Sequence, residues 1–271
     1  MELSAILILF FFGIVGGFLS GLLGVGGGII FVPILTYFLK QFGLDEEELV
    51  KYVLANSFAT IFFAGIISSL RQKKFSSFYP KQILLTASLA IVSSYVVSYL
   101  IVSQDWYSKR AFGILFLTLL LLTLFRFLFF KKQQERDIKS TKRVQFLITG
   151  FLTGIVTALS GLGGGVIMIP LFTQYLKLNI KTAAAISIGV IPLIVTPLLI
   201  NYGSQQPQDV FHSTQMGYLL PHLFFPMIAG LLFAAPLGVG VAQKAPDKHL
   251  KFIFAALIII VIINTIGNLI K

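Results

Sequence analysis

Residues 24–33 read GVGGGIIFVP, and residues 161–170 read GLGGGVIMIP. The two stretches superpose at an offset of 137 residues, and each has three consecutive glycines ahead of a proline. Each interrupts an uncharged apolar run, at 3–39 and at 144–176, that is too long for a single membrane span. The motif therefore predicts two related halves, each of which opens with a pair of hydrophobic segments broken by glycines.

The rest of the chain is also hydrophobic. Of the 271 residues, 56% are hydrophobic and only 11% are charged, whereas an average soluble domain has about 25% charged residues. A transmembrane helix needs about 20 mostly apolar residues. We therefore predict an all-α integral membrane protein with about eight to ten hydrophobic segments. The segments are expected near residues 3–23, 27–40, 51–70, 80–103, 110–130, 144–161, 165–177, 181–202, 216–243 and 249–270.

The basic residues predict how the chain is oriented. The linker 131–143 carries six of them, so the positive-inside rule predicts that it is cytoplasmic. Loops 71–81, 177–181 and 243–251 fall on the same side, and these four segments hold fifteen lysines and arginines against five on the other side. The acidic run 45–48 belongs to the outer side. The net charge of +11 thus reflects membrane topology, and no nucleic-acid partner is predicted.

Equivalent loops of the two halves differ in charge. Loop 71–81 is basic, whereas the corresponding loop 203–215 has no lysine or arginine, so the two loops are expected on opposite sides. This requires an odd number of crossings in each half, which is the inverted-repeat plan of secondary transporters. The predicted parts are an N-terminal transmembrane repeat (1–130), the basic cytoplasmic linker (131–143) and a C-terminal transmembrane repeat (144–271).

The path of the first two segments in each half stays open. Two full crossings and a re-entrant hairpin give the same topology, and the short segment 165–177 favours the hairpin. Upstream of the glycines, residues 18–21 match residues 151–154 only after a shift of four residues, about one helical turn.

The glycine clusters are candidates for an anion site. Glycines just before a short helix leave its first N–H groups without intrahelical partners. In hydrocarbon these donors must be satisfied by protein, water or ligand, and together with the positive helix end they can bind a small anion. The candidate substrate-binding residues are Gly24, Gly26, Gly27, Gly28, Asn56, Ser57, Gly161, Gly163, Gly164, Gly165 and Ser187.

Helix packing is the alternative role for these residues. Gly13, Gly17 and Gly21, spaced by four, have the pattern of small residues that let two helices approach closely. Asn56, Ser57 and Ser187 either donate hydrogen bonds to a bound anion or bond across helices, and both alternatives stay open.

Several function classes are excluded or disfavoured. The chain has no cysteine, and it carries no metalloprotease, serine-hydrolase, Walker A or dinucleotide-binding motif in a fitting context. We therefore predict no enzyme activity, no catalytic residue, no metal site and no cofactor. No acidic residue falls inside a predicted segment, so coupling to an ion such as H+ stays open.

The paired glycine stretches with Pro33 and Pro170, together with Ala55-Asn56-Ser57 and Ala185-Ile186-Ser187, resemble the sulfite exporter TauE/SafE family, also called the toluene sulfonate uptake permease family. The resemblance covers nearly the whole chain. It implies a multi-pass transporter of the plasma (inner) membrane that handles sulfite, sulfonates or related organic acids. Ile186 and Asn56 depart from the Thr that the family often has there, which bears on the substrate more than on the fold.

The sequence therefore predicts a secondary transporter that moves a small anion by alternating access, with the lipid bilayer and the anion as its partners. A passive small-anion channel and a non-transport membrane scaffold are the alternatives. Substrate identity, import or export, the coupling ion and the oligomeric state are left open by the sequence.

Overall fold

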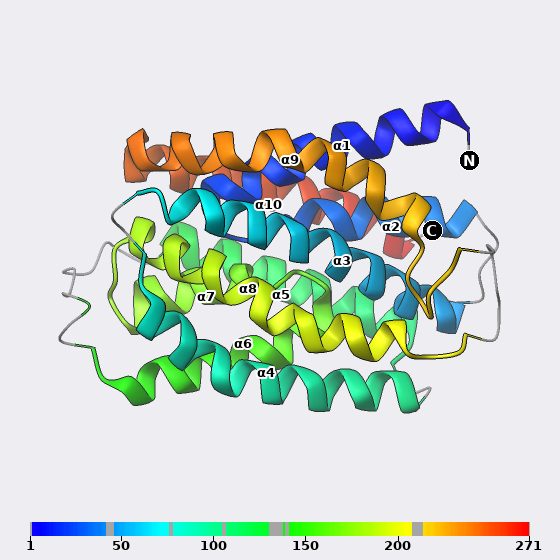
Figure 1. Cartoon of the computed structure of the whole chain (residues 1–271), viewed down its shortest axis with the longest axis horizontal. Coiled ribbons are helices and arrows are strands. Elements are labelled where there is room, and N and C mark those ends of the chain that lie inside the picture. Colours follow the sequence, from blue (N-terminus) through cyan, green and yellow to red (C-terminus); the bar gives the residue numbers. More distant parts are fainter. Residues whose placement is uncertain are drawn as a thin grey trace.

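The computed structural model describes residues 2–41, 46–75, 78–104, 107–129, 138, 141–207 and 214–270, and over these residues the chain is a helical bundle without strands (Figure 1). A single isolated bridge joins Met216 and Leu219. The elements are α1 (Leu3–Leu23), α2 (Gly28–Gln41), α3 (Glu46–Gln72), α4 (Pro80–Ser103), α5 (Lys109–Phe129), α6 (Arg143–Ser160), α7 (Gly165–Pro170), the π-helical turn η2 (Leu171–Tyr175), α8 (Ile180–Gly203), α9 (Pro221–Lys244) and α10 (Asp247–Ile270).

The bundle has the surface of a membrane protein. Among the described residues, six helices are long and apolar enough to cross a bilayer: α1, α3 from Glu48, α4, α6, α8 and α9. Large apolar side chains point outward from them, and Phe225, Phe233 and Leu237 on α9 are 59%, 72% and 65% exposed. Such exposed apolar surface suits lipid rather than water. The all-α membrane fold predicted from the sequence is confirmed.

Two helix starts differ from the prediction by more than two residues. Helix α9 begins at Pro221 instead of residue 216, because residues 216–220 form a turn in which Gly217 has φ +55° and proline suits the first helical position. Helix α3 begins at Glu46 instead of residue 51. Glu48, which precedes the predicted segment 51–70, is therefore a buried carboxylate within a helix, and the Tyr218 hydroxyl donates to it at 3.1 Å.

Helix α1 lies parallel to α9 in close contact. A Cβ at Gly13 would meet the backbone of Met227, and a Cβ at Gly17 would lie 2.6 Å from Leu231 Cβ. Gly21 meets Ala235 in the same way, so residue numbers rise together along both helices. The packing role predicted for these three glycines is confirmed.

The first two elements of each half form a hairpin that turns inside the bundle. The last residues of α1 lie beside the start of α8 and the end of α9, whereas α2 returns to the end of the bundle where α3 begins (Figure 1). Helix α6 and the α7–η2 segment form a second hairpin that enters from the opposite end (Figure 1). Of the two alternatives, the structure therefore has the hairpin.

Contacts between the two halves come in exchanged pairs. Helix α1 packs along α9 and α6 along α4; α3 contacts α9 and α4 contacts α8; α2 contacts α10 and α5 contacts α7. Helices α3 and α8 pack against each other between these pairs. Each of these contacts joins a helix within residues 1–130 to a helix within residues 144–271.

The two first helices are in register at one offset. Gly24 ends α1 with its N–H bonded to Ser20 O, and Gly161 ends α6 with its N–H bonded to Thr157 O. Gly150 and Gly154 pack on α4 as Gly13 and Gly17 pack on α9. The four-residue shift predicted upstream of the glycines is wrong, because it followed residue identity instead of the shared helix end.

Two predicted features lie largely outside the described residues. Of the basic linker 131–143, only residue 138 and residues 141–143 are described. Of the acidic run 45–48, only the Glu48 side chain is described.

Candidate functional site

Residues 24–28 and 161–165, here called the two glycine loops, require glycine for their backbone conformation. Gly26 and Gly27 have φ of +85° and +79°, and Gly163 and Gly164 have φ of +76° and +77°. This left-handed region is open to glycine but costs other residues free energy. Two such residues in a row let each chain turn between a helix end and the following helix start.

The glycine loops cross in direct contact. A Cβ at Gly28 would lie 2.6 Å from Leu162 Cα, and a Cβ at Gly165 would meet Val25 Cα and Gly24 O. A Cβ at Gly26 would lie 3.7 Å from Gly163 Cα. Gly27 and Gly164 instead face the first helix of their own half. The structure thus brings all eight candidate glycines to one crossing.

Two isoleucines flank this crossing. Ile191 Cδ1 lies 3.3 Å from the Cβ position of Gly26, and Ile61 Cγ2 lies 2.7 Å from that of Gly163. Both are fully buried in the middle of the two central helices, α8 and α3. The crossing therefore lies at mid-height of the bundle in an apolar setting.

Ser57 and Ser187, one from each half, each hydrogen-bond to the glycine loop of the other half. Ser57 Oγ donates to Gly161 O at 2.8 Å, and Ser187 Oγ donates to Gly24 O at 2.6 Å. Both serines are fully buried. The sequence left open whether these serines bind an anion or bond across helices. In the structure, both hydroxyl protons are used in bonds across helices.

Asn56 bonds away from the crossing. Its Nδ2 donates to Tyr52 O at 2.8 Å and to Tyr218 O at 3.0 Å, while its Oδ1 accepts from the Leu220 N–H at 2.8 Å. Asn56 thus holds the segment that leads into α9. Its counterpart Ile186 has no polar side chain for such an anchor.

The most informative feature of the site is a set of buried backbone donors. The first amide bonds of α2 and α7 begin at Ile30 and Ile167. Among the described residues, none accepts a hydrogen bond from the N–H groups of residues 25–29 or 163–166, all of which are buried. Unpaired buried N–H groups are rare in folded proteins, and here nine of them gather at one crossing.

Tyr107 is a further residue at the site that the sequence analysis missed. It lies in the connection between α4 and α5, and its hydroxyl donates to Leu159 O at 2.6 Å, next to the tip of the second hairpin. Burial raises the pKa of Tyr107, so the hydroxyl keeps its proton as a donor. A lone tyrosine in a loop carries no sequence signal for this role.

Removing either serine hydroxyl should destabilise the fold. Ser57→Ala leaves Gly161 O buried without its donor, so the free energy of unfolding should fall by about 1–3 kcal/mol. Ser187→Ala should do the same at Gly24 O. Thermal unfolding in detergent measures the loss, with Ser88→Ala as control, because exposed Ser88 bonds only Leu85 O in its own helix. Equal melting temperatures for all three variants would contradict the role of these bonds.

The apolar helices and the two inward-turning hairpins define a multi-pass integral membrane protein. The family model described as sulfite exporter TauE/SafE matches residues 9–265, and the chain belongs to this family. The predicted resemblance is confirmed over nearly the whole chain.

The chain is similar to three curated proteins described as probable membrane transporter proteins. The one from Methanocaldococcus jannaschii is 29% identical over 248 residues, covering 91% of this chain and 90% of the relative. The one from Haemophilus influenzae is 28% identical over 272 residues, covering 96% and 97%. YunE from Bacillus subtilis is 22% identical over 275 residues, covering 94% of each chain. No solved structure matches this chain at a significant level. The protein is thus a membrane transporter of the TauE/SafE family.

Proposed function

We propose that the protein is a secondary transporter that moves a small anion, namely sulfite, a sulfonate or a related organic acid, across the plasma membrane. The anion binds where the two glycine loops cross. The observation that carries this proposal is the set of unpaired, buried N–H groups of residues 25–29 and 163–166. An unsatisfied backbone group costs several kcal/mol in hydrocarbon, and an oxyanion at the crossing removes that cost.

Backbone amides do the binding, and the polar side chains position them. Both serine hydroxyls donate to carbonyls of the glycine loops, which turns those carbonyls toward the serines. Asn56 has its donors on Tyr52 O and Tyr218 O. Binding by backbone N–H groups also explains why the site needs no lysine or arginine at mid-height. The positive ends of the helices that start at Gly28 and Gly165 add to the attraction.

Alternating access comes from two inverted repeats, 1–130 and 144–271, that move relative to each other. The exchanged pairs of contacts between the halves support such a repeat. The end of the bundle that carries Arg71, Lys181 and Lys244, here called the basic end, faces the cytoplasm together with the linker 131–143. The pocket at the tip of the first hairpin supports a closed basic end, because its volume is only about 10 Å³, room for about one water molecule.

Anion binding is tested by thermal unfolding of detergent-purified protein with sulfite, sulfate, thiosulfate, taurine, sulfoacetate, acetate or chloride. A ligand at 100 times its Kd adds about 2.7 kcal/mol to stability, which raises the melting temperature by about 5–10 °C for a chain of this size. We expect a selective rise from sulfite or one sulfonate. Gly27→Val should lose it, since a Cβ there would lie 2.6 Å from the Phe31 ring and 2.9 Å from Gly16 O.

Gly240→Val is the matched control, because the Cβ position of Gly240 has Arg71 as its nearest neighbour, at 4.0 Å. It should keep the rise in melting temperature. Saturable flux with counterflow in liposomes then distinguishes a transporter from a channel. No rise with any of these anions, combined with no flux, would refute the proposed function.

A further inference from the structure

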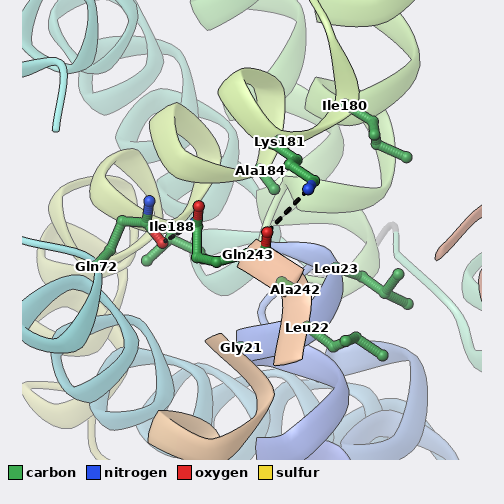
Figure 2. Close-up of a pocket in the computed structure, with 10 residues that line it drawn as sticks. All are labelled: Gly21, Leu22, Leu23, Gln72, Ile180, Lys181, Ala184, Ile188, Ala242 and Gln243. Carbon is green, nitrogen blue, oxygen red and sulfur yellow. Dashed lines mark hydrogen bonds between the residues drawn. The ribbon is translucent and has the colours of Figure 1, made fainter. Parts of the chain in front are cut away.

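A narrow pocket lies at the basic end, under the tip of the first hairpin (Figure 2). It is formed where α3 and α9 end and α8 begins. Ala184 lines this pocket and also lies against Gly24, whose Cβ position is 2.8 Å from Ala184 Cα. Ala184 therefore lies between the pocket and the residue that precedes the unpaired N–H groups of the first glycine loop. The lining residues of the pocket are Gly21, Leu22, Leu23, Gln72, Ile180, Lys181, Ala184, Ile188, Ala242 and Gln243.

Three polar side chains close the mouth of this pocket. Lys181 Nζ donates to Gln243 O at 2.9 Å, and Gln243 Nε2 donates to Gln72 Oε1 at 3.3 Å (Figure 2). Lys181 belongs to α8, Gln243 to α9 and Gln72 to α3. The chain of bonds thus ties together three helices that belong to both halves.

The placement of Lys181 is electrostatically unfavourable for its own helix. It is the second residue of α8, where the positive end of the helix repels a cation. Its ammonium instead points to a carbonyl in the last turn of α9, where a cation is favoured. Such a lysine adds little to the stability of α8, and its charge is available at the pocket.

The surroundings of the pocket are positive as well. Arg71, at the end of α3, has a buried Nε without a hydrogen-bond partner, and its guanidinium approaches α9 beside Gly240. Exposed Lys244 follows Gln243. In the helices that line the pocket, the turns at the basic end carry no acidic residue; Asp247 begins the next helix, α10. An anion arriving from the basic end therefore meets a positive field.

We propose that Lys181 is the first binding site of the transported anion at the basic end. Its bond to Gln243 O also keeps that end closed while no anion is bound. The ligand class is a small oxyanion: sulfite, a sulfonate or a carboxylate. The anion pairs with the Lys181 ammonium and displaces Gln243 O, which frees α9 from α8 and opens the pocket toward the glycine loops. The anion adds a Coulomb attraction between opposite charges that the neutral carbonyl lacks, which favours the exchange. This inference rests on the proposed function.

The first test compares Lys181→Gln with Lys181→Arg in anion flux into liposomes. The glutamine side chain keeps an N–H donor but loses the charge, whereas arginine keeps both. We expect KM for sulfite or sulfoacetate to rise about tenfold with kcat changed less than twofold, as for the loss of one bond to a charged group. Lys181→Arg should stay within twofold to threefold of the wild type. Arg110→Gln, which removes an exposed charge at the second position of α5 and does not touch the pocket, is the matched control.

The second test uses the absence of cysteine from the chain, which makes Lys181→Cys a single reactive site. The negatively charged 2-sulfonatoethyl methanethiosulfonate should label Cys at this position from one side of the membrane only. Saturating sulfite or sulfoacetate should slow this labelling. Reaction with 2-aminoethyl methanethiosulfonate restores a positive charge, and it should return KM toward the wild-type value.

The outcomes separate the inference from the proposed function. A wild-type protein that transports anions, with an unchanged KM in Lys181→Gln, overturns the role of Lys181 and leaves the anion site at the glycine loops standing. The same holds if labelling of Lys181→Cys is insensitive to anions while the wild type transports them. A wild-type protein that neither binds nor moves any of these anions overturns both.

Discussion

Gly28→Ala is expected to abolish anion transport and to lower the melting temperature. The new methyl group would lie 2.6 Å from Leu162 Cα and 2.7 Å from Gly161 O, both backbone atoms of the opposite loop. Ser57 holds Gly161 O in place, so the loop cannot move aside without losing that bond. Overpacking of this kind costs about 1–3 kcal/mol, and the separation of the loops misplaces the N–H groups that we assign to the anion.

The control for Gly28→Ala is Gly240→Ala, the same change in another helix with its nearest neighbour at 4.0 Å. Alanine is favoured over glycine by about 1 kcal/mol inside a helix, so this variant should be as stable as the wild type or slightly more stable. Melting temperature and sulfite flux are measured for both variants. Wild-type flux in a folded Gly28→Ala protein would show that the tight crossing is not needed for transport.

Asn56→Leu is expected to be the most destabilising single change of a side chain near the site. It leaves Tyr218 O and the Leu220 N–H buried without Asn56 as their partner. Each of the two stranded groups costs about 1–3 kcal/mol, which predicts a fall of roughly 4–24 °C in the melting temperature for a chain of this size. Thermal unfolding in detergent measures it.

The same variant separates an anchoring role of Asn56 from direct binding. If Asn56 acts only on the segment before α9, the fraction of Asn56→Leu that remains folded should bind sulfite or a sulfonate with the wild-type Kd. A tenfold weaker Kd would instead make Asn56 a ligand of the anion. Thr60→Val serves as control, because Thr60 lies one turn further along α3 and its hydroxyl donates to Asn56 O within the helix.

Hydropathy predicted most of the fold because the apolar residues within each segment are enough to identify it as a membrane span. Helices α1 and α4 occupy residues 3–23 and 80–103, as expected from the apolar runs alone. The start of α9 was missed because Leu219 and Leu220 extend the apolar run into a turn that Gly217 and Pro221 determine. Composition does not distinguish an apolar turn from the first turn of a helix.

The glycines of the site could be predicted, whereas the partners of its polar side chains could not. Three glycines in a row, twice, already indicate a special backbone. Ser57 and Gly161 are 104 residues apart, and Asn56 and Leu220 are 164 residues apart. Such bonds depend on how the two halves pack against each other, and no short stretch of sequence predicts that packing. In the sequence, Lys181 likewise indicates only which side of the membrane its loop faces, because its partner at the end of α9 is 62 residues away.

The reciprocal serine bonds make the centre of the molecule resemble an isologous dimer interface within one chain. Each half presents a hydroxyl and receives one, as two identical subunits do across a two-fold axis. Neither half therefore contains a complete crossing by itself. A change in one glycine loop is transmitted to the other through shared backbone contacts, so the two loops cannot evolve independently at this point.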